Sequence, residues 1–221
     1  MSKFWEKFFY ILTAIVQGSS FLRPRAYALM HRLHHAYADT EKDPHSPKYS
    51  KNVFSMMWQT RKVYNSIRND KFEFNEKFKD DFTYWPIFEK IVDTWAVRIF
   101  WMIVYLLVYI KYNTVLWLYL LLPFHFLMSP IHGAIINWYS HIYGYVNFKL
   151  NDTSKNLLPF DFLMMGEGYH NNHHFYGSRA NFGIRWYEFD VTFAIICLFN
   201  LIGIIKVKNA DNRLSTDVIE N

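Results

Sequence analysis

The chain has 221 residues, enough for one compact domain and short for two, and its single cysteine, Cys197, excludes an intrachain disulfide framework and a cysteine-rich metal site. Hydrophobic residues make up 52% of the chain and aromatic residues 20%, as is typical of membrane proteins with Trp and Tyr at the interfaces. The formal net charge is +5, and the basic residues flank apolar segments, which favours anionic lipid or an acidic partner over nucleic acid.

The first apolar segment covers about residues 8–22, which is short for a membrane span of about 20 residues. Pro24 is expected to end or kink this helix, and the next helix carries His31, His34 and His35 in the pattern H-x-x-H-H. Positions i, i+3 and i+4 share one face of a helix, so this pattern aims three imidazoles at one point. Because imidazole is the most common metal ligand in proteins, the pattern predicts a metal site.

Two further apolar segments, 96–110 and 114–132, are separated by a short polar break and predict a hairpin of two membrane-spanning helices. Two spans return the chain to the side of the membrane that it left. The break carries one lysine, whereas residues 23–71 are rich in Lys and Arg, so the positive-inside bias places the histidines on the cytoplasmic side. The alternative is a pair of buried helices in a soluble core.

Histidines recur after the predicted hairpin. Asn137 and His141 are four residues apart and are expected to share a helical face, and His170, His173 and His174 repeat H-x-x-H-H. The two pentads and His141 supply seven imidazoles, more than the four ligands of a structural zinc site. Neither pentad contains a carboxylate, so the pattern favours two metal ions and iron–dioxygen chemistry over hydrolysis by zinc.

The remaining elements complete the predicted architecture. His125 and His132 are expected to be hydrogen-bonded residues outside the metal site, because His132 lies about half a turn round the helix from His141. The last apolar segment, 191–207, either spans the membrane or lies along its interface. The sequence therefore predicts an all-α fold, a membrane-embedded helical bundle with a cytosolic helical cap that carries the histidines, in a single domain over residues 1–221.

Three stretches of the chain resemble the integral-membrane fatty acid desaturases, and within them the delta-9 acyl-CoA desaturase group. The stretches are His31 to Pro47 with its Asp-Pro-His turn, Asn137 to Gly144, and Gly166 to His174 with Gly-Glu-Gly before the pentad. The likeness extends from near residue 1 to about residue 206. It implies an O2-dependent enzyme in which two non-haem iron ions remove two hydrogens from an acyl chain and leave a cis double bond. The implied metal ligands, with Asn137 acting through water, are His31, His34, His35, His141, His170, His173 and His174, and no other catalytic residue is implied.

The resemblance also implies partners. The expected substrate is acyl-CoA or another carrier-linked acyl chain, and the expected electron donor is a separate protein of the ferredoxin, rubredoxin or cytochrome b5 type. The chain would be integral to a bacterial inner membrane or the endoplasmic reticulum. Trp58, Arg61 and Lys62 resemble a family stretch near the acyl head group, with a solvated charge pair as the alternative. Glu167 and His45 are expected to orient ligand imidazoles, although Glu167 alternatively caps a helix and His45 alternatively belongs to a hydrogen-bonded turn.

The chain also departs from the family pattern. The family carries H-x-x-x-x-H before the segment that resembles Phe4 to Leu22, whereas no histidine precedes His31 here. Two ligand positions of the pattern are then unfilled, which predicts weak metal binding and low or no activity for the chain by itself, as in a truncated enzyme. The alternatives to a desaturase are a lipid hydroxylase of the same superfamily and a non-catalytic membrane protein that binds metal.

Overall fold

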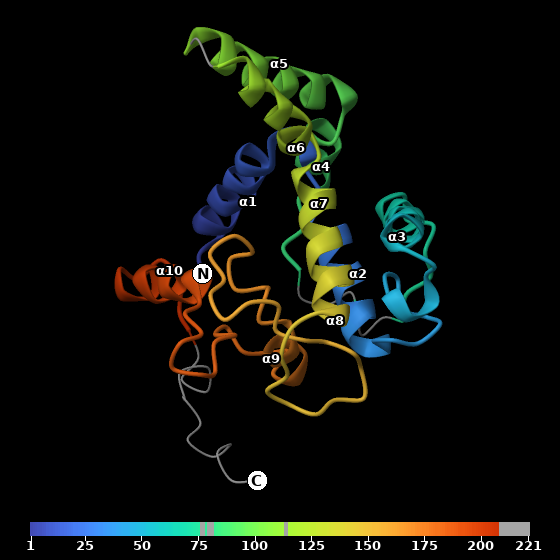
Figure 1. The fold of residues 1–221 in the computed structure, drawn as a ribbon. Helices are drawn as coiled ribbons and strands as arrows, with labels where there is room; N and C mark the ends of the chain where they lie inside the picture. The colour runs from blue at the N-terminus through green and yellow to red at the C-terminus, as the bar shows by residue number, and fades with distance from the viewer. Residues whose placement is uncertain (76–77, 79–81, 113–114, 208–221) are drawn as a thin grey trace. The chain divides into compact units, whose positions relative to one another are not determined.

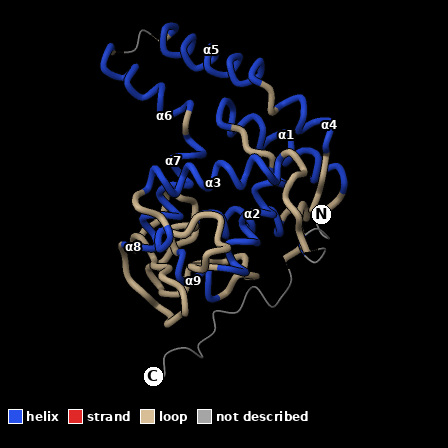
Figure 2. The backbone as a smooth tube through the Cα atoms, turned by 90° about the vertical axis from the view of Figure 1, so that its right-hand side faces the viewer, coloured by secondary structure: helices blue, strands red, loops and turns tan. Residues whose placement is uncertain are grey.

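The computed structural model describes residues 1–75, 78, 82–112 and 115–207 (Figure 1). The chain divides into two compact units, Glu6–Ile135, here called the N-terminal unit, and Met1–Trp5 with Ile136–Asn221, here called the C-terminal unit. Over the described ranges the regular structure is helical, and extended backbone pairs only in isolated bridges (Figure 2). The predicted all-α class is confirmed, whereas the single domain over residues 1–221 stays a prediction.

The N-terminal unit is built around α2 (Pro24–Tyr37). The helix α1 (Lys3–Gln17) ends at the turn η1 (Gly18–Ser20), and Pro24 occupies the first turn of α2, as the sequence predicts. Gly18 has φ +52°, and a Cβ there would lie 1.8 Å from the Tyr105 hydroxyl oxygen, so this tight turn requires glycine.

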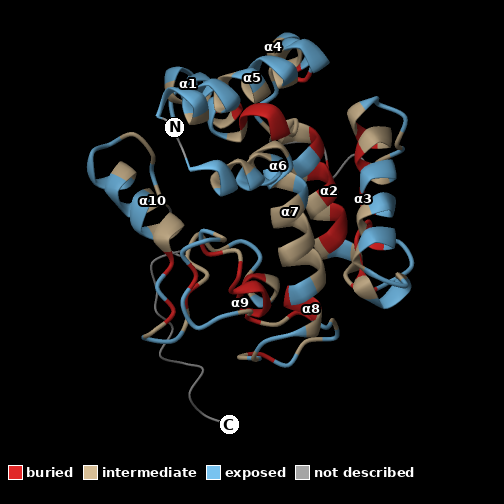
Figure 3. Ribbon diagram, turned by 45° about the horizontal axis from the view of Figure 1, so that its top comes forward, coloured by how far each residue is buried: buried red, intermediate tan, exposed pale blue. Residues whose placement is uncertain are grey.

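One face of α2 is apolar and packs against α3 (Val53–Arg68). This core contains Ala26, Leu29, Met30, Leu33, Tyr64, Ile67 and Phe78. Figure 3 shows the buried residues running along α2, while the outer face of α3 is exposed. The packing fixes α2 along its length. The histidines of α2 do not belong to this apolar core.

The helices α4 (Pro86–Val92) and α5 (Trp95–Lys111) meet at a bend of 55°. Asp93, whose side chain is 1% exposed, lies at this bend and pairs with Arg23 at 2.7 Å, Arg98 at 2.6 Å and Arg68 at 2.5 Å. Arg98 also donates to the carbonyl oxygens of Ser19 and Phe21. The buried carboxylate therefore ties the bend to the turn after α1.

The second apolar limb is broken rather than straight. It contains η4 (Leu116–Leu121), α6 (Leu122–Phe126) and α7 (Met128–Ala134), followed by a π-helical turn, Ile135–Tyr139, and α8 (Ser140–Ile142). The limb bends by 73° between Phe126 and Met128. Pro130 cannot donate a backbone hydrogen bond to the carbonyl oxygen of Phe126, which interrupts the helical ladder at this point.

No single helix among the described residues is long and apolar enough to cross a membrane, but the two bent pairs, 86–111 and 116–142, meet the length and composition that a span requires. Asn113 in the predicted break and Thr114 at the start of the second predicted limb lie outside the described residues. The Nε2 atom of His125 lies 2.8 Å from the Tyr109 hydroxyl oxygen, which confirms the prediction that His125 is hydrogen-bonded.

The C-terminal unit consists mainly of loops, with α8 and the short helices α9 (His170–Phe175) and α10 (Val191–Leu201) (Figure 1). The predicted apolar segment 191–207 thus begins as expected at Val191, but its helix ends at Leu201. Asp190 caps α10 by accepting from the backbone N–H of Phe193 at 2.9 Å.

Candidate metal centre

The first H-x-x-H-H pattern lies on α2, and its spacing brings the imidazoles of His31 and His35 together, as the sequence predicts. The Nε2 atoms of His31 and His35, four residues apart, are 3.1 Å from each other, and their ring centroids are 4.5 Å apart. Leu29, Met30 and Leu33 hold the helix from the apolar core.

His34 is fully buried and is oriented by a carboxylate. Its Nδ1 lies 3.0 Å from both carboxylate oxygens of Asp43, which also accept from the backbone N–H groups of Asp39 and His45. An ionised carboxylate only accepts hydrogen bonds, so Nδ1 carries the proton and the lone pair of His34 is left on Nε2. The ring of His45 packs on that of His34 at 4.3 Å between centroids.

The second H-x-x-H-H pattern lies on α9 and repeats the ring spacing of the first. The centroids of His170 and His174 are 4.4 Å apart. His174 Nδ1 lies 3.0 Å from a carboxylate oxygen of Asp152. Burial would raise the pKa of Asp152, but hydrogen bonds from His174 and Ser154 outweigh it and lower this pKa below its usual value. The carboxylate is therefore ionised and holds the proton of His174 on Nδ1.

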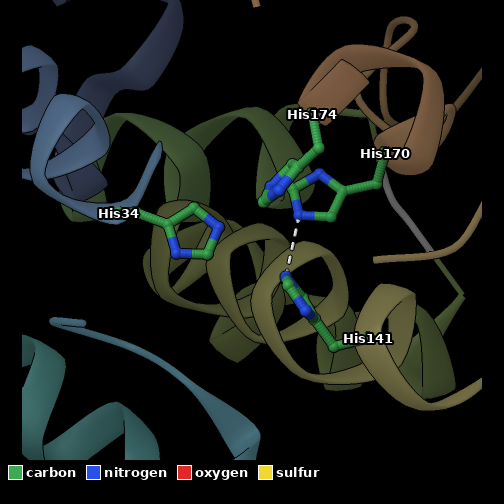
Figure 4. Close-up of side chains that lie close together, drawn as sticks. All are labelled: His34, His141, His170 and His174. Carbon is green, nitrogen blue, oxygen red and sulfur yellow. Dashed lines mark hydrogen bonds between the residues drawn. The ribbon is translucent and has the colours of Figure 1, made fainter. Parts of the chain in front are cut away.

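His141 joins the second pentad within the C-terminal unit. It follows the π-helical turn that contains Asn137, and a π turn changes the direction in which the following side chains point. His141 Nδ1 lies 3.1 Å from the Thr153 hydroxyl, and its Nε2 lies 3.1 Å from Nε2 of His170 (Figure 4). The candidate donor nitrogens of His141, His170 and His174 all lie within 4.8 Å of one another.

These distances fit imidazoles that share a metal ion. Two nitrogens that bind one metal at roughly 2.1 Å and at a right angle are about 3 Å apart. The two Nε2 pairs, His31 with His35 and His141 with His170, are both 3.1 Å apart. An all-imidazole donor set with carboxylates on the outer nitrogens suits a transition metal such as iron, and differs from the oxygen donors that Mg²⁺ and Ca²⁺ prefer.

The two asparagines inside the second pentad are buried and hold α9 in place. The Asn171 amide oxygen accepts from the backbone N–H groups of Asn147 and Phe148, and its amide nitrogen donates to the carbonyl oxygens of Phe148 and Ser154. This amide therefore joins the start of α9 to both ends of the loop that carries Asp152.

Asn172 is bonded as completely. Its amide oxygen accepts from the side chains of Asn147 and Asn156, and its amide nitrogen donates to Phe182 O and to a Glu188 carboxylate oxygen. Glu188 itself is 5% exposed and also accepts from the Tyr145 hydroxyl. A six-residue helix has little stability by itself, so these amides supply the support that α9 needs.

The structure places the other predicted residues as follows. Trp58, Arg61 and Lys62 lie together on the exposed face of α3, where both cations sit over the indole ring at 5.3 and 5.9 Å and line a shallow hollow of about 190 Å³ with Asn65. Their substrate role stays a prediction. His173 is buried, with its ring 4.1 Å from that of Phe182.

Glu167 is half-buried near two other carboxylates. Its pKa is raised to about 7, first by burial and then by the negative charges of Asp190 and Asp161. Its role in orienting an imidazole stays a prediction. The N-cap residue of α9 is Tyr169, not Glu167, and its side chain makes no capping hydrogen bond.

Sequence reasoning missed the groups that hold the imidazoles in this structure. Asp43 stands in the Asp-Pro-His turn, so its motif was visible although its contact with His34 was not. Asp152, Thr153, Asn171 and Asn172 gave no such signal, because loop contacts between distant residues leave no periodic pattern.

The helical fold and the buried imidazoles define an all-α protein with donor sets suited to a transition metal. The fatty acid desaturase family model matches residues 2–196, and the chain belongs to this family. It is 32% identical over 193 residues to the Delta-9 desaturase-like 5 protein of Arabidopsis thaliana, a match covering 82% of this chain and 58% of that protein. The chain is thus a delta-9 desaturase-like member of the family.

Two further relatives carry names that state a substrate. Identity is 27% over 210 residues to the Delta-9 acyl-lipid desaturase 2 of Arabidopsis thaliana, covering 92% of this chain and 64% of the relative. It is 27% over 207 residues to the sn-1 stearoyl-lipid 9-desaturase of Synechocystis sp., covering 91% and 60%. The chain therefore spans about three fifths of the length of these relatives. No solved structure gives a significant match to the chain.

Proposed function

We propose that this chain carries the diiron chemistry of an O2-dependent desaturase that introduces a cis double bond into a fatty acyl chain. In this proposal the imidazoles of both pentads, together with His141, hold one pair of non-haem iron ions, and Asn137 contacts one iron through water. Family membership supports the reaction class, and the paired Nε2 atoms 3.1 Å apart, found in each unit, support metal binding by these histidines.

The residues of the chain itself prepare the site. Bound iron supplies the activation of dioxygen. Asp43 and Asp152 keep protons on the Nδ1 atoms of His34 and His174, so that each ring presents a neutral Nε2. Complete burial of His34 excludes water from one side of its ring. These contacts fix the donors before metal binds, which lowers the cost of assembling the site.

We propose a carrier-linked fatty acyl chain as the substrate, an electron-donor protein as the source of two electrons, and a membrane location with the histidines facing the cytoplasm. The relatives named for acyl-lipid and stearoyl-lipid substrates favour a lipid-linked chain over the acyl-CoA expected from the sequence. The two bent helical pairs have the length and composition to support the membrane location.

Product analysis in cells tests this proposal. The chain is expressed in a host without its own desaturase, and fatty acids from lipid and acyl-CoA pools are analysed separately by gas chromatography and mass spectrometry. We expect a monounsaturated product that disappears in His174→Ala, at a low level in the wild type because two ligand positions of the family pattern are unfilled. The matched control is His132→Ala, a half-buried histidine on α7 outside the candidate donor groups, which should keep the product.

Two outcomes would overturn the proposal. A hydroxylated acyl chain in place of an olefin would assign a lipid hydroxylase. Unchanged lipids, together with iron that co-purifies with the wild-type chain and is lost from His174→Ala, would assign a non-catalytic metal-binding protein.

A further inference from the structure

Two segments of the C-terminal unit pair with an inverted pattern of polarity. An isolated parallel bridge joins Asp161 to Asp190. In extended backbone, successive side chains point to opposite sides. Both aspartates are 5% exposed, whereas Phe160, Phe162 and Phe189 beside them are 60%, 65% and 56% exposed. Carboxylates thus point inward and phenyl rings outward, the reverse of a surface built to face water.

The backbone of the first segment is satisfied from within. The Asp161 carboxylate accepts from the N–H groups of Met164, Gly166 and Gly168 at 2.8, 3.0 and 2.7 Å. Gly166 has φ +96°, and a Cβ there would lie 2.6 Å from an Asp190 carboxylate oxygen, so the loop closes tightly over the acidic pair. A loop that enters a medium of low polarity must satisfy its N–H groups internally, and this loop does so at these three positions.

The exposed apolar surface extends beyond the bridge. Leu163 is 78% exposed and Trp186 is 95% exposed. We call Phe160, Phe162, Leu163, Trp186 and Phe189 the aromatic rim. The helix α10 follows directly, and Leu198 and Leu201 on it are exposed. Figure 3 shows exposed positions along this helix. The parallel bridge brings Phe160 alongside Phe189, and Trp186 and α10 lie close to Phe189 along the chain. Exposed apolar groups gathered in this way mark an interaction surface.

The charged side chains of the C-terminal unit indicate which kind of surface the aromatic rim contacts. Across the described part of the C-terminal unit, every exposed charged side chain is basic, namely Lys3, Lys149, Arg185 and Lys206. Asp161, Glu188 and Asp190 are buried, and Asp152 and Glu167 are half-buried. Arg185 immediately precedes Trp186. Exposed aromatic and aliphatic groups beside cations, with acids withdrawn, match an anionic lipid interface.

We infer that the aromatic rim docks on the surface of an anionic bilayer, with the rim side chains in the interfacial layer and Arg185 at the lipid phosphates. Trp and Phe partition favourably into this layer, and a cation beside them gains attraction to anionic headgroups. The inference is independent of the metal centre and shares with the proposed function only the membrane location.

Fluorescence of Trp186 tests the inference in the full chain, reconstituted in vesicles of phosphatidylcholine and phosphatidylglycerol. The lipids are used with or without bromine on the acyl chains near the headgroup. The spectrum of Trp186→Phe is subtracted from that of the wild type, because the chain has 8 tryptophans. We expect the Trp186 component to lose most of its intensity in brominated vesicles and to be protected from aqueous acrylamide.

Trp58→Phe is the matched control. Trp58 is 56% exposed on α3 and carries Arg61 and Lys62 over its ring, so its component should be quenched by acrylamide and not by brominated lipid. Conservative replacement of two exposed indoles leaves the fold intact.

Two results overturn the inference. Acrylamide quenching of Trp186 would show a rim in water, and protection from both quenchers would show a rim covered by protein. Flotation of the vesicles, measured without fluorescence, separates these results from failure of the membrane location. A chain that floats with an acrylamide-quenched Trp186 contradicts only the docking surface, whereas a chain that does not float contradicts the proposed location.

Discussion

The imidazole rings of the two H-x-x-H-H pentads have nearly the same spacing, but the two pentads have entirely different support. The first and fifth imidazoles are 4.5 Å apart in the N-terminal unit and 4.4 Å apart in the C-terminal unit, and the first and fourth are 6.4 and 6.3 Å apart. The first pentad stands on a 14-residue helix fixed by apolar packing. The second stands on a 6-residue helix fixed by side-chain amides.

The comparison separates what the motif determines from what its surroundings determine. Helical spacing by itself sets the distances between the rings. The position of the helix depends on burial of Leu29 and Leu33 in one unit and on the hydrogen bonds of Asn171 and Asn172 in the other. In each unit one carboxylate fixes one imidazole, Asp43 on the fourth residue of the first pentad and Asp152 on the fifth residue of the second.

Replacement of Asn172 with alanine should have the largest effect on stability. It removes four side-chain hydrogen bonds and leaves several buried groups without a partner, each at a cost of about 1–3 kcal/mol, for a total of about 4 kcal/mol when water replaces some of the bonds. Thermal unfolding in detergent measures the loss, with exposed Asn151→Ala as the control. Equal melting temperatures for the two variants would show that the amide network does not support α9.

Replacement of Leu29 with alanine breaks the support of the other pentad. Leu29 is fully buried in the core of α2 and α3, and truncation at such a site costs about 3 kcal/mol. The matched control is Phe54→Ala on α3, which is 82% exposed and should change stability by less than about 0.5 kcal/mol. The same assay applies, and a loss no greater than in the control would contradict apolar anchoring of the first pentad.

Neutralising either carboxylate sharpens the comparison, because here the two units should behave alike. Asp43→Asn and Asp152→Asn each keep the side-chain size but weaken control of the Nδ1 proton, which should reduce metal affinity by about 10–100-fold. Competition with a chromophoric chelator measures the affinity for Fe²⁺. Asp70→Asn, at an exposed position paired with Arg25, is the control and should leave affinity unchanged. An effect in one unit only would mean that the carboxylates are not equivalent.

The smallest effect is expected from titration of Glu167 in the C-terminal unit. Because its pKa rises from 4.5 to about 7 on folding, the folded state holds this proton more tightly, and stability falls as the pH rises between these values. After a discount for partial exposure, the loss is on the order of 1 kcal/mol. Glu167→Gln mimics the neutral form. The melting temperature of this variant should equal that of the wild type near pH 4.5 and exceed it above about pH 7. A pH profile of melting temperature parallel to that of the wild type would exclude Glu167 as the titrating group.

The sequence predicts those features that depend on local spacing or on a single residue type. Pro24 marks the start of α2, and Val191 marks the start of α10. The bend at Leu127 was not predicted, although Pro130 is a visible signal of an interrupted helical ladder. The π turn at 135–139 was not predicted because π turns have no periodic signal. The contacts of Asp152 and Thr153 with the imidazoles of His174 and His141 join residues 12 to 22 positions apart through loops, which local patterns do not encode.

The central claim is that both pentads and His141 hold one pair of iron ions. The most direct test measures the iron content and the Mössbauer spectrum of the full chain, purified from cells grown on iron-57. The unfilled ligand positions predict weak binding, so the measurement is made at saturating Fe²⁺. We predict two magnetically coupled iron ions per chain, with the coupling lost in His35→Ala and also in His174→Ala, one variant in each unit. Iron that is uncoupled in the wild type, or coupling that survives either substitution, would contradict a shared centre.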